Sequence, residues 1–208
     1  LVIATHPHAD HIGGMADVIN GIPVDKFVMS FMPEDETPTS ATYLSMLEAL
    51  DEHNVPVEEA KPGTVYPLGT AQLTVLAPLS DSDEANNISV VTRLAFGKRS
   101  FLFMGDAETE VDDELLASGR TLAADVIKVG HHGSATSSRK NFLAAVSPSY
   151  ALITCDGTEE AGAPHEKVVR YLEEYSIPFL RTDENGVISV WTDGTDIALD
   201  TERETVIR

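Results

Sequence analysis

The segment THPHADHIGG, residues 5–14, places three histidines and an aspartate within six positions. His6 and His8 are separated by Pro7 where an apolar run ends, so both imidazoles can point the same way. Asp10 and His11 follow where a helical pattern begins, and they can face a neighbouring position. Neutral imidazole and carboxylate are natural ligands of zinc and similar divalent ions. The pattern favours a metal site over a chance group of surface histidines or a helix cap.

Two later segments carry the same ligand types at the ends of apolar runs. Asp106 follows FLFMG, and a carboxylate in that position needs a partner to offset its loss of hydration. His131 and His132 follow DVIKVG. Consecutive side chains diverge, so we expect one of the two to bind a metal and the other to contact substrate or support the ligands. Because all these residues lie at strand ends, we expect them around one cleft.

The elements that must position these residues alternate along the chain. Strand-like runs cover residues 1–5, 26–30, 71–77, 89–96, 100–104, 125–129, 150–154, 179–181, 187–192 and 196–199. Helical patterns cover residues 12–20, 40–54, 108–117, 138–146 and 165–175. Turn pairs at Gly97-Lys98, Asn185-Gly186 and Asp193-Gly194 predict hairpins. This order predicts sheets covered by helices, an α/β or α+β layered domain over residues 1–208.

Composition sets limits on partners and location. The 208 residues are 42% hydrophobic, enough for one domain with a substantial core. The formal net charge of −20 repels polyanions, so productive nucleic-acid binding would need a local basic patch or bound cations. The single cysteine, Cys155, excludes an internal disulfide. No apolar run approaches the roughly 20 residues that span a bilayer, and cytoplasmic and extracytoplasmic locations both stay open.

The motifs together resemble those of the metallo-β-lactamase superfamily. THPHADHIGG resembles its metal-binding motif, SFLFMGDAE at residues 100–108 resembles the strand ending in Gly-Asp, and DVIKVGHHGSATSS at residues 125–138 resembles the strand ending in a further histidine. With NNISVV at residues 86–91, the match is most similar to the branch that contains the C-terminal hydrolase domain of the DNA-uptake protein ComEC. The resemblance implies an αββα sandwich with a two-metal hydrolytic site. It implies six metal ligands, among which Asp106 bridges the ions: His6, His8, Asp10, His11, Asp106 and His131.

The branch implies phosphodiester hydrolysis by a metal-bound hydroxide, with two divalent ions, zinc or manganese, as cofactors. Asp10 would orient the water or bind the second metal. His165 is a candidate for substrate contact or proton transfer, although it could simply begin a helix. Four further residues are candidate substrate contacts: Asn86, Asn87, His132 and Ser134. The net charge favours a small phosphodiester or another anionic ester over long nucleic acid.

Two departures from the family pattern bear on the metals and on the fold. Most members offer a third histidine to the first metal where this chain has Asn86 and Asn87, and an amide oxygen favours harder ions such as Mn²⁺. We therefore expect the first metal to bind more weakly. Family domains usually begin with further strands, so the resemblance also implies an N-terminally incomplete first sheet. The alternative functions are an acyl hydrolase acting on β-lactams or thioesters and a non-catalytic interaction domain.

Overall fold

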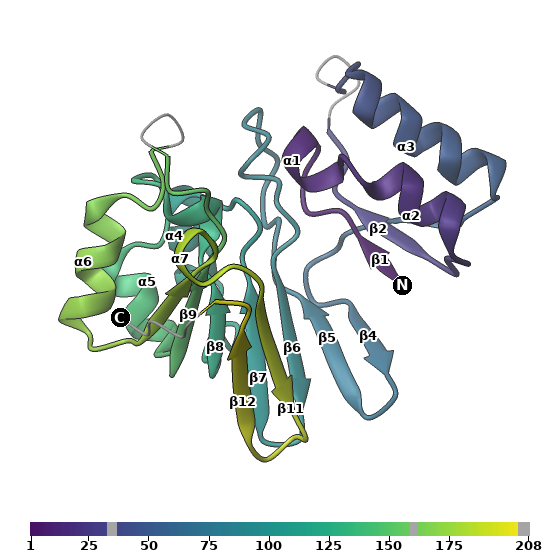
Figure 1. The fold of residues 1–208 in the computed structure, drawn as a ribbon. Helices are drawn as coiled ribbons and strands as arrows, with labels where there is room; N and C mark the ends of the chain where they lie inside the picture. Colours follow the sequence, from purple (N-terminus) through teal and green to yellow (C-terminus); the bar gives the residue numbers. More distant parts are fainter. Residues whose placement is uncertain (33–36, 159–161, 204–208) are drawn as a thin grey trace.

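Two β-sheets face each other, and each carries helices on its outer side (Figure 1). The computed structural model describes residues 1–32, 37–158 and 162–203. The smaller sheet is parallel in the order β1-β2-β3, with β1 at Val2–Ile3, β2 at Phe27–Met29 and β3 at Val57–Glu59. Its helices are α1 (Ala9–Ile12), α2 (Met15–Gly21) and α3 (Ala41–Glu52).

The sequence of α3 explains both its start and its buried face. Ser40 precedes the helix in an extended conformation, and its side chain accepts a hydrogen bond from the Tyr43 backbone N–H, which would otherwise lack a partner. Tyr43, Met46 and Leu50 recur at helical spacing and are buried. They belong to the apolar cluster that joins α2 and α3 to the smaller sheet. This packing holds the helices on the outer side of the sheet and leaves its other face for the second sheet.

The larger sheet has seven strands in the order β10-β9-β8-β7-β6-β5-β4. The antiparallel part contains β4 (Val65–Leu68), β5 (Ala71–Val75), β6 (Thr92–Phe96) and β7 (Arg99–Phe103). From β7 onward, β8 (Val126–Lys128), β9 (Tyr150–Ile153) and β10 (Phe179–Arg181) run parallel. The connecting helices are α4 (Thr109–Ala117), α5 (Lys140–Val146) and α6 (Glu166–Glu174). Because parallel strands end at the same edge, the residues that follow β7, β8 and β9 meet there.

The end of the described chain packs against the larger sheet. The short helix α7 (Thr182–Asn185) is followed by the hairpin of β11 (Ile188–Thr192) and β12 (Ile197–Thr201). The tip of this hairpin meets the β6–β7 turn, where the backbone N–H of Lys98 donates to the oxygen of Gly194. Among the described residues, every helix is too short or too polar to span a lipid bilayer.

An apolar cluster between the two sheets fixes their separation. It contains Val28 of β2 together with Tyr66, Leu73 and Val75 from β4 and β5. A larger cluster on the other side of the seven-stranded sheet buries the inner faces of α4, α5 and α6. With the α2–α3 cluster, these interfaces give a helix-sheet-sheet-helix order, so the ends of β1 and β7 are held facing each other.

The predicted layered α/β architecture is confirmed, although several predicted elements differ from the observed ones. The predicted helix over residues 12–20 is two helices, α1 and α2, separated by Gly13 and Gly14. The predicted strand over residues 89–96 begins only at Thr92. Before that point, the backbone N–H of Val90 donates to the oxygen of Thr5, so this segment connects the two sheets.

The predictions near β3, β4 and β10 fail for local reasons. The hairpin predicted at Asn185-Gly186 is wrong, because Asn185 ends α7 and β10 pairs with β9 rather than β11. The side chain of Asn185 accepts a hydrogen bond from the backbone of Arg181 and holds this helical turn. Strands β3 and β4 were not predicted, since β3 contains two glutamates and β4 contains Pro67. Both lie at sheet edges, where polar residues and proline are tolerated.

Candidate metal centre

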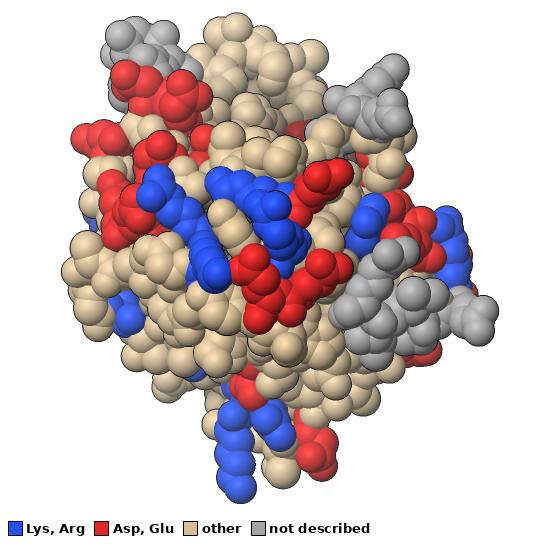
Figure 2. Space-filling model, turned by 90° about the vertical axis from the view of Figure 1, so that its left-hand side faces the viewer, with Lys and Arg blue, Asp and Glu red and all other residues tan. Residues whose placement is uncertain are grey.

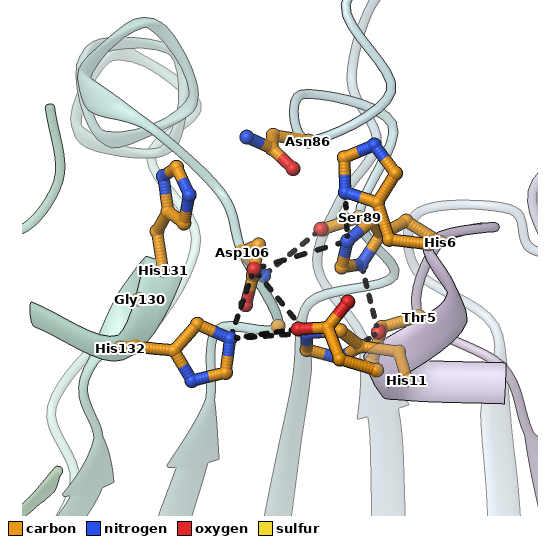
Figure 3. Close-up of polar contacts among 12 residues, drawn as sticks. Thr5, His6, His11, Asn86, Ser89, Asp106, Gly130, His131 and His132 are labelled. Carbon is orange, nitrogen blue, oxygen red and sulfur yellow. Dashed lines mark hydrogen bonds and ion pairs between the residues drawn. The ribbon is translucent and has the colours of Figure 1, made fainter. Parts of the chain in front are cut away.

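Ligand-type side chains gather where strands of both sheets end (Figure 3). The smaller sheet contributes residues that follow β1 and residues of α1. The larger sheet contributes Asp106, from the loop that follows β7, and residues of a short 3₁₀ turn, η2 (Gly130–Gly133), that follows β8. In chain order the side chains are His6, His8, Asp10, His11, Asp106 and His132.

Four of them form a compact group, because the ligand atoms of Asp10, His11, Asp106 and His132 all lie within 4.8 Å of one another. Oδ2 of Asp106 is 3.2 Å from Nε2 of His11 and 3.3 Å from Nε2 of His132, and these nitrogens are 3.3 Å apart. Oδ2 of Asp10 is 3.4 Å from the His11 nitrogen and 3.3 Å from the His132 nitrogen. Two ligands of one tetrahedral zinc, each bonded at about 2.0–2.1 Å, lie roughly 3.3–3.4 Å apart. The group therefore has the donors and the spacing of a metal site.

Hydrogen bonds behind the imidazoles turn their Nε2 atoms toward this group. Nδ1 of His132 lies 2.6 Å from the backbone oxygen of Thr154. A carbonyl oxygen can only accept, so Nδ1 carries a proton, and in the neutral ring Nε2 keeps its lone pair. Oγ1 of Thr5 lies 3.2 Å from Nδ1 of His6 and 3.4 Å from Nδ1 of His11. Partners of this kind fix the orientation and tautomer of metal-binding histidines.

His6 and His8 add two nitrogens beside the same carboxylate. His6 is 3% exposed, and burial together with the neighbouring His11 lowers its pKa to about 3. Its ring is therefore neutral, which is the form that binds metals. Nε2 of His6 lies 3.1 Å from Nδ1 of the exposed His8 and 3.8 Å from Oδ2 of Asp106.

Asp106 lies at the centre of these contacts and is 2% exposed. Its backbone N–H donates to Oγ of Ser89, and Nζ of Lys128 lies 3.7 Å from its Oδ1. Within the described part of the chain, Oδ1 has no hydrogen-bond partner. Burial alone would raise the pKa of Asp106, but hydrogen bonds from His11 and His132 and the charge of Lys128 hold it well below its usual range. The hydrogen bond between His132 and Asp106 in turn raises the pKa of His132.

The backbone around the group is tightly constrained. Gly105 has a φ of +56°, and a Cβ there would lie 3.0 Å from the side chains of both Ser89 and Thr5. His131 and His132 have φ values of +45° and +54°, a left-handed conformation that residues other than glycine rarely adopt. Such residues cost about 1–3 kcal/mol each, and they persist where the surroundings hold them. Here the backbone N–H of His131 donates to the oxygen of Gly105.

The turn directs its two histidines to different places. His132 points to Asp106, whereas His131 points away from it (Figure 3). Nδ1 of His131 lies 3.0 Å from Oε1 of Glu108, and that oxygen also accepts a hydrogen bond from Oγ1 of Thr136 at 2.9 Å. The structure thus places His132 in the four-residue group where the sequence analysis placed His131. The left-handed backbone of both residues sets these directions, and the local sequence pattern does not reveal it.

Asn86 and Asn87 both contact Glu108, the partner of His131. Asn87 accepts a hydrogen bond from the Glu108 backbone N–H, which orders the start of α4. Nδ2 of Asn86 donates to Oε1 of Glu108 at 3.1 Å, and Oδ1 of Asn86 is buried with no hydrogen-bond partner in the described residues. The oxygen of Asn86 points toward the interior of the group (Figure 3). Of the two side-chain oxygens, that of Asn86 is therefore the one open to a ligand.

Ser134 and His165, the remaining predicted site residues, differ in position. Ser134 lines a cavity of about 450 Å³ that also has Asp10, His131 and His132 in its wall. His165 precedes α6 as its capping residue, and its Nδ1 accepts a hydrogen bond from the Lys167 backbone. The His165 side chain is exposed and is not part of that cavity wall.

Residues 1–157 match the sequence profile of the Metallo-beta-lactamase superfamily. The chain belongs to this superfamily. Its curated relatives include ComE operon protein 3 of Bacillus subtilis, 35% identical over 192 residues, and competence protein ComA of Neisseria gonorrhoeae, 36% identical over 104 residues. These alignments cover 90% and 50% of this chain but 24% and 15% of the relatives. The chain therefore spans less than a quarter of their lengths.

A solved structure supports the metallo-β-lactamase fold at lower identity. CmlA, a diiron β-hydroxylase from Streptomyces venezuelae, matches with a TM-score of 0.55 and 15% identity, over 86% of this chain and 42% of its own. The predicted αββα architecture and the predicted relation to the ComEC-like branch are both confirmed. Superfamily membership supports hydrolase-type chemistry in general, and the Asp and His cluster is its candidate metal site.

The residues that support the ligands were not predicted from the sequence. Two of them carried a usable sign: Lys128 interrupts the apolar run DVIKVG, and Glu108 stands two residues after Asp106. A lysine inside a buried strand needs an anionic or carbonyl partner, and here Nζ donates to the oxygen of Gly105. Three more are ordinary polar residues that only the fold brings to the ligands: Thr5, Ser89 and Thr154.

Proposed function

We propose that this chain is a metal-dependent hydrolase that cleaves phosphodiester bonds. The observation that carries the proposal is the set of five donor-to-donor distances of 3.2–3.4 Å among Asp10, His11, Asp106 and His132. We also propose that residues 1–208 act as one hydrolase domain, since the inter-sheet cluster joins both sheets that contribute ligands.

The chemistry of the donors fits a divalent ion. Two carboxylates and two imidazole nitrogens would be an unfavourable group without positive charge between them, because the nitrogens of His11 and His132 lie only 3.3 Å apart. The buried Oδ1 of Asp106 and Oδ1 of Asn86 also lack hydrogen-bond partners within the described residues. A cation at the group offsets both the repulsion among these acceptor atoms and the missing partners of the two buried oxygens.

We infer places for two ions, zinc or manganese. Asp10, His11, Asp106 and His132 would hold one of them. His6 and His8 would hold the other together with Asp106, whose carboxylate lies near both sets. The oxygen of Asn86 is a further candidate ligand where a third imidazole is absent, and it favours manganese at that position.

Each residue then has a role in ester hydrolysis. Divalent ions supply a water of lowered pKa and offset negative charge on the phosphate. The Asp10 side chain is 62% exposed while its Oδ2 stays at the group, so it can accept a hydrogen bond from an attacking water. Thr5 and Thr154 keep the imidazoles oriented, and Lys128 and Ser89 keep Asp106 in place. In this proposal His165 caps α6 and contributes little to turnover.

Surface charge favours a small substrate. Figure 2 shows the face that carries α6, where lysine and arginine side chains gather between acidic ones. Ion pairs in this helical layer include Lys140 with Glu174 and Arg139 with Asp113, so acidic partners offset part of the basic charge. The chain as a whole carries −20. We therefore infer a small phosphodiester or another anionic ester as substrate, because this field repels long polyanions.

The experiment is hydrolysis of bis(p-nitrophenyl) phosphate by protein stripped of metal and reloaded with Zn²⁺ or Mn²⁺. We expect metal-dependent turnover, and we expect Asp106→Asn to lower it roughly 100-fold or more, since even partners of metal ligands are worth about 10–100-fold. His165→Ala serves as the matched histidine control and should change turnover less than about fivefold. Equal losses of turnover in both variants would contradict the roles proposed for Asp106 and His165.

The alternative functions give different results in the same assay. Turnover of nitrocefin or a thioester, with none of the phosphodiester, would favour an acyl hydrolase, and metal binding without any turnover would favour a non-catalytic domain.

A further inference from the structure

A cavity adjoins the candidate metal centre and shares Asp10 and His132 with it. Its volume of about 450 Å³ falls within the roughly 300–1,000 Å³ of typical small-molecule sites. The cavity lies on the side of the larger sheet, in the loops that follow β8 and β9 and at the start of α7. A molecule bound at the metals would therefore extend over these loops.

Contacts between neighbouring residues lead from the metal centre along the cavity wall. His132 is held by the backbone oxygen of Thr154 at 2.6 Å. The next residue, Cys155, donates its backbone N–H to Oγ1 of Thr182 at 2.8 Å, and Asp156 follows it. Burial raises the pKa of the Cys155 thiol to about 11, so this part of the wall presents a neutral thiol. The wall thus runs from metal-type ligands to the carboxylate of Asp156.

The wall offers hydroxyl groups and acceptors instead of positive charge. Ser134, Thr154 and Thr182 bring hydroxyls, Asp156 brings an exposed carboxylate, and the described residues of the wall include no lysine or arginine. The N–H and O–H groups of a base and a sugar would find acceptors here. A second phosphate would face Asp156 with no cation from this wall to offset the repulsion. His131 adds a flat ring on which a base can stack.

We propose that this cavity binds the uncharged nucleoside part of a small nucleotide ester while the metal centre binds the adjoining phosphate. The inference rests on the proposed phosphodiesterase function and narrows its substrate to phosphodiesters of a single nucleotide. In the reaction, water adds to phosphorus, the P–O bond to the outgoing alcohol breaks, and that alcohol takes the proton. The nucleoside monophosphate is the product left in the cavity.

Calorimetric binding to metal-loaded protein tests the cavity without requiring turnover. The probes are thymidine 5′-monophosphate, ribose 5-phosphate, inorganic phosphate and thymidine 3′,5′-bisphosphate. We expect the monophosphate nucleotide to bind about tenfold or more tighter than inorganic phosphate and ribose 5-phosphate, because only it carries a base. The bisphosphate should bind more weakly than the monophosphate, because its second phosphate meets Asp156.

Charge reversal at the wall provides the matched variants. Asp156→Lys should improve binding of the bisphosphate relative to the monophosphate by about tenfold, since it replaces a repulsive charge with an attractive one. Asp51→Lys makes the same charge change on α3, at an exposed residue outside this cavity, and should leave the ratio within about twofold. Oδ1 of Asp156 also accepts a hydrogen bond from the Thr158 backbone N–H and so holds a turn. Asp156→Asn keeps an acceptor oxygen for this bond and removes only the charge. It should raise the affinity for the bisphosphate relative to the monophosphate, but by less than Asp156→Lys does.

The outcomes separate this inference from the proposed function. Inorganic phosphate or ribose 5-phosphate binding as tightly as the nucleotide would overturn the nucleoside site. Tighter binding of the bisphosphate to the unmodified protein, or an equal shift of the ratio in both lysine variants, would also overturn it. If the nucleotide binds as expected but no phosphodiester is hydrolysed, the cavity inference stands and the proposed function fails.

Discussion

Oγ1 of Thr5 lies 3.2 Å from Nδ1 of His6, at the point where β1 passes into the histidine-rich motif. The same hydroxyl lies 3.4 Å from Nδ1 of His11. A hydroxyl oxygen has two lone pairs, so it can accept from both Nδ1–H groups. One small side chain therefore supports two rings whose Nε2 atoms both approach Oδ2 of Asp106.

Replacing this hydroxyl should weaken metal binding without disturbing the fold. We expect Thr5→Val to lower zinc affinity about 10–100-fold, because both rings lose the partner that sets their tautomer and direction. Thr5→Ser keeps the hydroxyl and should stay within a few-fold of the unmodified protein. Competition with a chromophoric chelator measures both. Equal affinities for the valine and serine variants would show that the Thr5 contacts do not support the ligands.

Gly105 connects stability to the position of Asp106. An alanine there must adopt a φ of +56° and place its Cβ 3.0 Å from Ser89 and Thr5, so we expect a loss of about 2 kcal/mol or more in unfolding free energy. Gly69 is the matched control, because it has a φ of +63° but a Cβ added there would meet no described atom within 4 Å. Gly69→Ala should cost only about 1 kcal/mol, from backbone conformation alone. Urea unfolding of both variants gives the comparison, and a Gly105→Ala cost no larger than that of Gly69→Ala would contradict the tight contact between the sheets.

Asp112 should make the protein less stable as pH rises. It is fully buried in α4, and burial raises its pKa to about 7, although the Arg139 backbone N–H donates to its Oδ2. An unfolded aspartate has a pKa of about 3.9, so between these values the folded state binds more protons than the unfolded state. The unfolding free energy therefore falls as pH rises from about 4 to 7, and the cost is complete above that range.

Asp112→Asn removes this titration and tests it. Between pH 5 and pH 8, we expect the unmodified protein to lose about 2–3 kcal/mol more unfolding free energy than the variant loses. The comparison of slopes matters more than the absolute stabilities, because the asparagine also places an amide in a buried position. Chemical denaturation at the two pH values gives the slopes, and parallel losses would show that Asp112 does not titrate as its burial implies.

Much of the fold could be predicted because it follows from periodicity and from turn chemistry. The helical pattern over residues 40–54 and the turn pair Gly97-Lys98 each lead to the element observed, although Leu44 and Leu47 of the predicted apolar face are exposed. Positions at strand ends likewise predicted that Asp106 and the histidines of the first motif come together, because strand ends meet at sheet edges.

The remaining features depend on contacts between distant segments. The choice between His131 and His132 is set by a left-handed backbone at both residues and by the Thr154 oxygen, 22 residues away from His132 in sequence. The carboxylate of Glu108 contacts His131 and Asn86, which belong to other segments of the chain. No local pattern carries this information, because a positive φ at histidine is sustained by its surroundings.

The two histidines of this turn should therefore differ in metal binding. We expect His132→Ala to lower zinc affinity about 100-fold or more, because it removes a nitrogen that lies 3.3 Å from both Asp106 and Asp10. His131→Ala should leave the affinity within a few-fold, since that ring contacts Glu108. Metal titration of the two stripped variants supplies the values. A larger loss of zinc affinity in His131→Ala than in His132→Ala would show that His131 is the ligand.

Anomalous diffraction from crystals soaked in Zn²⁺, with data collected on both sides of the zinc edge, locates the bound metal directly. We predict a peak bounded by Nε2 of His11, Nε2 of His132 and carboxylate oxygens of Asp10 and Asp106, at about 2.0–2.2 Å from each. A second peak beside His6 and His8 would complete the two-metal arrangement. A fully soaked crystal with no peak among the four residues, or with zinc held by His131 instead of His132, would contradict the four-residue metal site.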